Sequence, residues 1–157
     1  MNVLLLNLLL ALAWISLTGE ISEENFAFGF ILGYGMLWLW RGLLGNSTYF
    51  LKVFRVINFV LYFLKELVIA NIRVAIEVLT PNLKVKPAIV AIPLSVKSSQ
   101  EITLLANLIT LTPGTLSLDV SDDKKTLYVH TMYMGDADDF RRSIKEGFEK
   151  RVQEVFD

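Results

Sequence analysis

The sequence contains no cysteine, one histidine and, among its first forty residues, no lysine or arginine. The absence of cysteine excludes disulfides and thiolate metal sites, and His130 has no second imidazole with which to share a metal. There is no glycine-rich phosphate loop. No serine or threonine has a general base at a sequence spacing that would indicate a nucleophile. In the last helical segment, basic and acidic side chains alternate, which is typical of a solvated face rather than a nucleic-acid patch. We therefore predict no enzyme activity, no cofactor, no metal and no nucleic-acid partner.

Apolar side chains, by contrast, are abundant. Of the 157 residues 54% are hydrophobic, and the mean hydropathy is +0.50, which is too apolar for an ordinary soluble domain. Because the excess lies before residue 80, we predict a membrane region followed by one compact domain. The predicted divisions are a two-helix transmembrane hairpin over 1–44, an amphipathic interfacial helix over 45–81 and a small cytoplasmic α+β domain over 82–157.

The predicted hairpin consists of two apolar runs, Asn2–Thr18 and Phe26–Leu44, joined by a short acidic turn. Each run is about long enough to cross a bilayer once as a helix. Before Arg41 neither run has an acidic or basic side chain, whereas a segment that carries cations or protons through hydrocarbon is expected to have one. Lysine and arginine collect after the second run, so the positive-inside rule places the turn outside and both ends in the cytoplasm.

Three residues of the hairpin are candidates for contacts between helices. Asn7 is strongly polar, and a hydrogen bond to a neighbouring helix accounts for it better than ion binding does. Gly29 and Gly33 have the small-xxx-small spacing that lets helices approach closely. We predict that these glycines pack first against the other helix of the hairpin and second against foreign helices.

Phe50–Leu79 is apolar over most of a helical wheel yet carries charges at regular intervals. At about 100° per residue its polar side chains, Asn71 excepted, fall within one arc of roughly 140°. This polar arc consists of Lys52, Arg55, Asn58, Lys65, Glu66, Arg73 and Glu77. A spanning helix would take Lys65 and Glu66 through hydrocarbon at a cost of about 2.5–3.5 kcal/mol each. We predict an amphipathic helix lying flat or obliquely at the membrane surface, with a buried core helix as the alternative.

After Pro81, which is expected to end this helix, the pattern becomes that of a small α+β domain. Strand-like alternation covers 85–96, 115–121 and 126–134, and helical spacing covers the segment after the first strand and the segment after the third. The predicted order is β-α-β-β-α, with two helices on one face of the sheet. Pro87 and Pro93 indicate that the first strand lies at a sheet edge or is bent.

Two local signals mark the ends of the first helix of this domain. Ser98 and Glu101 have the spacing of a capping box, which predicts a helix start. The sequence Thr112-Pro113-Gly114-Thr115 predicts a turn in which the glycine takes a positive φ.

Asp136, Asp138 and Asp139 form a carboxylate cluster before the last helix. The cluster could be a metal site, but carboxylates at a helix start also cap free N–H groups and complement the helix dipole, and we favour that interpretation. For His130 we favour a structural, cross-strand role over a ligand role.

The run from Glu101 to Leu116 resembles a known family, and Leu-Thr-Pro-Gly-Thr at 111–115 is its most specific part. It is followed by a strand, an Asp-rich loop and Tyr128-Val129-His130, and it is preceded by Asn71–Ala75 in the amphipathic segment. These features are similar to the E-type component of the multisubunit Mrp-type Na+/H+ antiporter of bacteria and archaea, the MrpE/MnhE family. The resemblance covers essentially the whole chain.

The resemblance implies a non-catalytic accessory subunit of a hetero-oligomeric monovalent cation (Na+)/H+ antiporter in the prokaryotic cell membrane. Other, polytopic subunits similar to those of respiratory complex I would carry the ion pathways, and they and the lipid bilayer are the expected partners. On this interpretation the chain supports assembly and stability of the complex. The residues predicted to lie at subunit interfaces are Asn7, Gly29, Gly33, Thr112, Pro113, Gly114 and Thr115.

Two other hypotheses remain. A freestanding membrane-tethered sensor would bind a small ligand in a pocket lined by Thr110, Thr112 and His130. A homo-oligomer that conducts ions itself is disfavoured by the lack of intramembrane charge.

Overall fold

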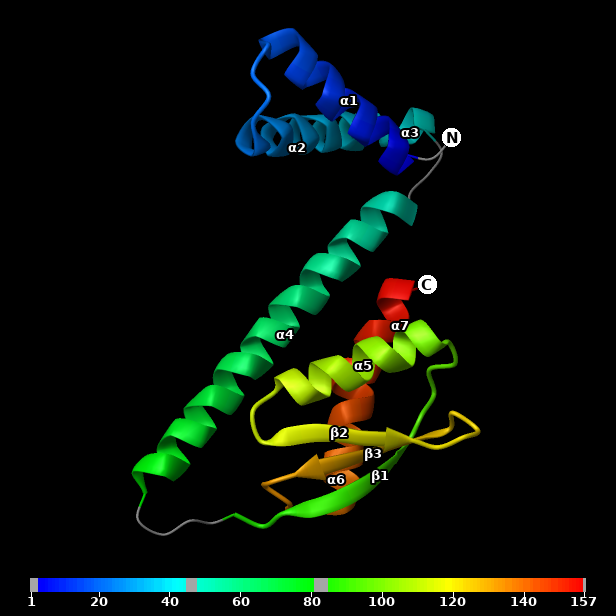
Figure 1. Ribbon diagram of the computed structural model, residues 1–157. Coiled ribbons are helices and arrows are strands. Elements are labelled where there is room, and N and C mark those ends of the chain that lie inside the picture. The colour runs from blue at the N-terminus through cyan, green and yellow to red at the C-terminus, as the bar shows by residue number, and fades with distance from the viewer. Residues whose placement is uncertain (1–2, 45–47, 81–84, 157) are drawn as a thin grey trace. The chain divides into compact units, whose positions relative to one another are not determined.

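The computed structural model describes residues 3–44, 48–80 and 85–156 (Figure 1). By its contacts the chain divides into two compact units, unit 1 (Met1–Phe54) and unit 2 (Arg55–Asp157). Helix α4 (Thr48–Leu79) contributes residues to both units. Pro81, predicted to end this helix, lies outside the described residues.

Unit 1 contains α1 (Val3–Thr18), α2 (Glu23–Leu39), the short α3 (Arg41–Leu44) and the start of α4. Both predicted apolar runs are therefore helical, but the second ends earlier than predicted because Trp40 leaves the helical conformation. Among the described residues no helix meets the combined length and hydropathy needed for a membrane span.

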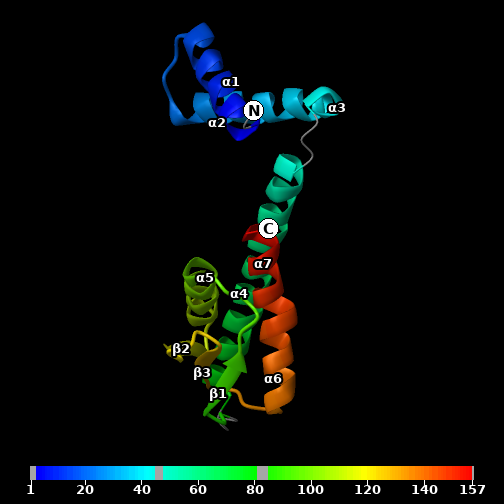
Figure 2. The same cartoon turned by 90° about the vertical axis from the view of Figure 1, so that its right-hand side faces the viewer.

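Unit 2 contains a three-stranded antiparallel sheet in the order β1-β3-β2. Its strands are β1 (Ala88–Pro93), β2 (Thr115–Val120) and β3 (Thr126–Thr131). The predicted edge position of the first strand and the β-α-β-β-α order are both confirmed. Helix α5 (Ser99–Leu111) and the last helix lie on the same face of the sheet (Figure 2).

The core of unit 2 lies between this inner sheet face and the helices. It is lined by alternate residues of β1 and β3, by one side of α5 and by the last helix, with α4 side chains packed against it. Its fully buried members include Ile92, Leu105, Ile109, Leu127, Val129 and Val152. On the outer face, by contrast, Ile89 and Leu116 are exposed. A bulge between Ser117 and Asp119 shifts Val120 to the inner face, an irregularity that simple alternation does not predict.

Helix α5 begins with the predicted capping box. Ser98 Oγ accepts a hydrogen bond from Glu101 N, and the Glu101 carboxylate accepts one from Ser98 N. A further hydrogen bond from the Ser98 hydroxyl is the main cause that lowers the pKa of Glu101. Two of the donors at the helix start are thereby satisfied.

The last helix consists of α6 (Ala137–Ile144), a π-helical segment η1 (Lys145–Glu149) and α7 (Lys150–Phe156). Its core residues Ile144, Phe148 and Val152 recur at every fourth position. Four residues advance about 400° in an α-helix, so this spacing drifts around the helix by roughly 40° per step. The wider π turn corrects the drift and keeps all three side chains buried.

Candidate functional site

The predicted glycines of α2 lie in the seam between α1 and α2. A Cβ added to Gly29 would stand 2.9 Å from the Trp14 ring, and one added to Gly33 would collide with Asn7 Oδ1 and lie 3.2 Å from Leu10 Cβ. Both glycines thus face α1 of the same chain, which lets the two helices approach closely.

Asn7 is fully buried where α1, α2 and the start of α4 meet. Its Nδ2 donates to Tyr49 Oη at 3.1 Å, and the Tyr49 ring packs at 5.3–5.9 Å from the rings of Tyr34 and Phe50. Its Oδ1, turned toward Gly33, has no hydrogen-bond partner among the described residues. Asn7 therefore joins helices within unit 1, as expected for a helix-packing residue.

We expect Gly33→Leu to destabilise the hairpin by about 1–3 kcal/mol, because the added side chain must separate α1 from α2. Trp14 reports the change in a variant whose other two tryptophans, Trp38 and Trp40, are replaced by phenylalanine. Quenching of its fluorescence by a brominated detergent should increase. The matched control is Gly35→Leu, since Gly35 has open space around its Cβ position. Equal quenching in the two variants would contradict the packing role of Gly33.

The turn 112–115 folds inward, not toward solvent. Gly114 has φ +90°, as predicted, and a Cβ there would lie 2.7 Å from the Tyr133 ring. The Thr115 hydroxyl donates to Ile109 O at 2.6 Å, and the Thr112 hydroxyl donates to Leu108 O at 2.9 Å. Both hydroxyls therefore tie the turn to the end of α5.

The same turn faces α4 across a cavity of about 100 Å³. Thr112, Pro113 and Thr115 line one side of the cavity, while Glu66 and other α4 residues line another. The four residues of the turn thus lie next to α4 and to the segment after β3 in their own unit. Their predicted place at an interface with another subunit stays a prediction.

Part of the polar arc of α4 contacts the rest of unit 2, whereas Asn58 and Lys65 are exposed. On the same side of α4 the Tyr62 ring packs edge-on against Phe148 with ring centres 5.5 Å apart, and the Arg151 guanidinium lies 3.7 Å from the Tyr62 ring centre. Arg55 donates to Glu154 O at 3.1 Å. Burial, followed by the charge of Glu66, raises the pKa of Tyr62 above its ordinary value.

The opposite side of α4 in unit 2 is apolar and uncovered. We call this surface the α4 stripe; its side chains are between 40% and 84% exposed. The α4 stripe consists of Ile57, Val60, Leu61, Leu64, Val68, Ile69, Ile72, Ile76, Val78 and Leu79. The helix is therefore neither a free amphipathic helix nor a fully buried core helix: one side belongs to unit 2 and the other has no cover among the described residues.

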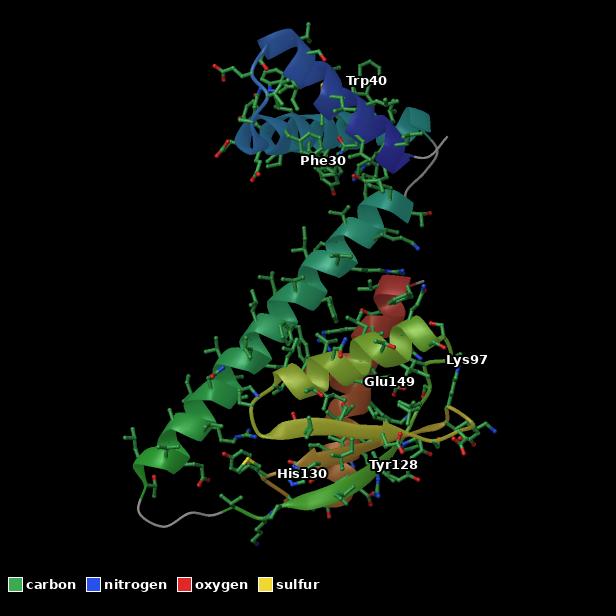
Figure 3. The ribbon with its side chains drawn as sticks, in the orientation of Figure 1. Phe30, Trp40, Lys97, Tyr128, His130 and Glu149 are labelled. Carbon is green, nitrogen blue, oxygen red and sulfur yellow. The ribbon has the colours of Figure 1, made fainter. Side chains whose placement is uncertain are left out.

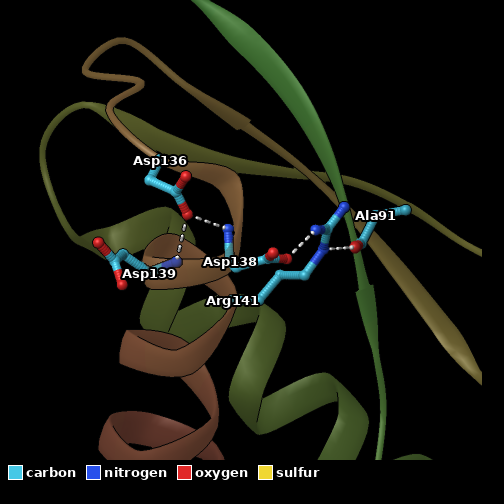
Figure 4. A network of polar contacts seen from close by, with 5 residues as sticks. All are labelled: Ala91, Asp136, Asp138, Asp139 and Arg141. Atoms are coloured by element: carbon cyan, nitrogen blue, oxygen red, sulfur yellow. Dashed lines mark hydrogen bonds and ion pairs between the residues drawn. The ribbon is translucent and has the colours of Figure 1, made fainter.

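The carboxylate cluster before α6 is a helix cap. Asp136 Oδ1 accepts from Asp138 N at 2.8 Å and from Asp139 N at 3.1 Å (Figure 4). Asp138 pairs with Arg141 Nη1 at 2.7 Å, and Arg141 Nε also donates to Ala91 O on β1. The predicted capping role of the cluster is confirmed.

The pocket that the sensor hypothesis requires is not formed. His130 pairs with Ile89 and Leu116 on the outer face of the sheet (Figure 3), whereas Thr112 lines the cavity next to α4 together with Thr131. Since neighbouring residues of a strand point to opposite faces, the sheet separates His130 from that cavity.

The alternating charges of the last helix, Glu149 among them, were predicted to form a solvated face, but Glu149 is buried, with 2% of it exposed. Its Oε1 accepts hydrogen bonds from Ser95 N and Val96 N, and its Oε2 lies 3.4 Å from Lys145 Nζ (Figure 3). It therefore fixes the segment after β1 to the last helix. A glutamate placed among core positions, next to Phe148, was the only sequence signal for this contact.

Together these observations define a class of protein, a small chain with a helical unit and an α+β unit. One long apolar face of α4 is uncovered among the described residues, which is typical of components of larger assemblies. A family model described as Na+/H+ ion antiporter subunit matches residues 7–155. The chain is 38% identical over 152 residues to the E-type Na(+)/H(+) antiporter subunit of Alkalihalophilus pseudofirmus and 41% identical over 152 residues to that of Bacillus subtilis. In each case the match covers 97% of this chain and 96% of the relative. The chain belongs to the MnhE family of Na+/H+ antiporter subunits.

Two solved structures contain chains of similar fold. One is the Mrp complex from Dietzia sp. DQ12-45-1b, with 30% identity and a TM-score of 0.50 over 66% of this chain and 96% of that chain. The other is the membrane-bound sulfane sulfur reductase, an archaeal respiratory membrane complex, with 25% identity and a TM-score of 0.55 over 99% of this chain and 100% of that chain. Both similar chains are parts of larger complexes.

Proposed function

We propose that this chain is a non-catalytic accessory subunit of a multisubunit Na+/H+ antiporter in the cell membrane, where it supports assembly and stability of the complex. The observation that carries the proposal is the family match over nearly the whole chain, in relatives named as Na+/H+ antiporter subunits. Ion transfer is assigned to other subunits because α1, and α2 beyond Glu24, have no acidic or basic side chain.

On this proposal α1 and α2 form a hairpin in the bilayer, and unit 2 lies on the cytoplasmic side. The outer surface of the hairpin supports this placement, because many of its apolar side chains are exposed, among them Leu5, Leu9, Leu12 and Ile31. Arg41, whose guanidinium lies 4.8 Å from the Trp38 ring centre, fits the aromatic and basic flank of a membrane helix.

An assembly role is tested in cells that lack this chain. The antiporter is followed on native gels through a tag on a polytopic subunit, and Na+/H+ exchange is measured in everted membrane vesicles. We expect most of the assembled complex to be lost and both readouts to recover together when the chain is restored. A complex that assembles fully without the chain yet exchanges no ions would contradict the accessory role and assign the chain a direct part in transport.

A further inference from the structure

We infer that the α4 stripe binds the surface of an anionic phospholipid bilayer. Helix α4 then lies between the bilayer and the rest of unit 2. This inference rests on the proposed function in one respect: the hairpin must hold the chain at a membrane. It adds that lipid covers the stripe and that the headgroups of this lipid are negatively charged.

The side of α4 that packs on the rest of unit 2 and the side that carries most of the stripe are opposite each other. Tyr62, Glu66 and Ala70 face the rest of unit 2 and are half-buried or buried, whereas most stripe residues point away from it and are exposed. Ile69, at the edge of the stripe, is exposed and also lines the cavity beside the turn 112–115. A helix whose protein-covered side and apolar side are opposite can lie in the plane of a bilayer with its domain above it. A spanning helix would instead be apolar around its circumference.

The width and composition of the stripe favour lipid over a partner helix. At about 100° per residue the stripe covers roughly 180° of the helix, wider than the narrow seam used by a single packed helix. Its large side chains are valine, leucine and isoleucine, with Ala75 and Asn71 also exposed on the same face, and it contains no glycine that would let a second backbone approach closely. Such a surface suits acyl chains, which adapt to any side-chain shape.

The charges within and beside the stripe determine which lipid it fits. Lys65 and Arg73 are exposed, and the Arg73 guanidinium lies 5.9 Å from the Tyr133 ring centre. Glu66 is on the side toward the rest of unit 2 and is half-buried, and Glu77, also half-buried, lines a hollow beside the stripe together with Arg73. The exposed charges near the stripe are therefore basic, which is complementary to anionic headgroups. Lys65 can extend its apolar stem along the stripe and place its ammonium among phosphates.

The test uses the full-length chain in lipid nanodiscs of phosphatidylcholine, with or without phosphatidylglycerol. Because the sequence has no cysteine, single cysteines introduced as Leu64→Cys, Ile31→Cys and Asp122→Cys each take one environment-sensitive fluorophore. Asp122 is in the β2–β3 loop, on the side of unit 2 away from α4 (Figure 1). Lipids carrying a nitroxide near the headgroup or near the end of the acyl chain quench the fluorophore according to depth.

We expect the label at residue 64 to be quenched more by the shallow than by the deep nitroxide, and the label at residue 122 by neither. Lys65→Glu should shift the equilibrium between seated and unseated α4 by about tenfold toward unseated in anionic discs. Lys125→Glu, the same charge change in the β2–β3 loop, should leave it unchanged.

Several results would overturn the inference. They are an unquenched label at residue 64, stronger quenching by the deep nitroxide, equal quenching in neutral and anionic discs, and a stripe label that loses its lipid contact when the whole complex is assembled. The last would show that a protein covers the stripe. The label at residue 31 separates this failure from failure of the proposed function, because an unquenched Ile31→Cys label would contradict the transmembrane hairpin itself.

Discussion

Replacing Glu149 by leucine is expected to lower the free energy of unfolding of unit 2 by about 4 kcal/mol. The substitution leaves the part-buried N–H group of Ser95 and the buried N–H group of Val96 without their acceptor, and a buried group left unpaired costs about 1–3 kcal/mol. It also leaves the Lys145 ammonium without its carboxylate. Hydrogen exchange of amides in β1 and β3, followed by mass spectrometry on the full-length chain, measures the loss in unit 2 alone.

Two variants separate the buried acceptor from the charge at this position. In Glu149→Gln the side-chain oxygen can still accept from both N–H groups, so we expect less than half of the effect. Glu146→Leu changes an exposed glutamate of the same π-helical segment and should leave exchange nearly unchanged. If Glu149→Gln were as destabilising as Glu149→Leu, the ion pair with Lys145 would be the main contribution and the assignment to the two N–H groups would be wrong.

Gly114→Val is expected to destabilise unit 2 by about 3 kcal/mol. A β-branched residue is strained at φ +90°, and its Cβ would overlap the Tyr133 ring. Because the turn lines the cavity beside α4, the loss should appear in α4 as well as in the sheet. Exchange of α4 amides from residue 66 to residue 74 measures that part directly.

The control for this substitution is Gly135→Val, since Gly135 has no atom within 4 Å of its Cβ position and no positive φ. The double variant Gly114→Val with Tyr133→Ala removes the overlap but keeps the backbone strain, so it should recover part of the stability lost in Gly114→Val. Equal destabilisation by Gly114→Val and Gly135→Val would contradict the special role of the turn.

Sequence patterns predicted the elements whose determinants are local. The capping box at Ser98, the positive φ of Gly114 and the cap at Asp136 depend on a few neighbouring residues, and each was found as predicted. The order of elements along the chain was also predictable, because alternation and turn residues mark the strands and the hairpin.

Features that depend on tertiary contacts were not predictable from these patterns. The polar arc of α4 indicated contact with water, and Asn58 and Lys65 are exposed, but Arg55 binds Glu154 O and the neighbouring Tyr62 packs on Phe148, both far along the chain. The same holds for Glu149, whose partners lie more than fifty residues away. The π turn was not predicted; it includes Gly147, where an added Cβ would collide with the Tyr62 hydroxyl on α4.

The most direct test of the accessory role is affinity purification of the C-terminally tagged chain from its native membrane in mild detergent, with mass spectrometry of the proteins that accompany it. We expect several large polytopic membrane proteins in a fixed ratio to the chain, and we expect Gly33→Leu to reduce their recovery while Gly35→Leu does not. Recovery of the chain alone, as a monomer or a homo-oligomer, would contradict the proposal.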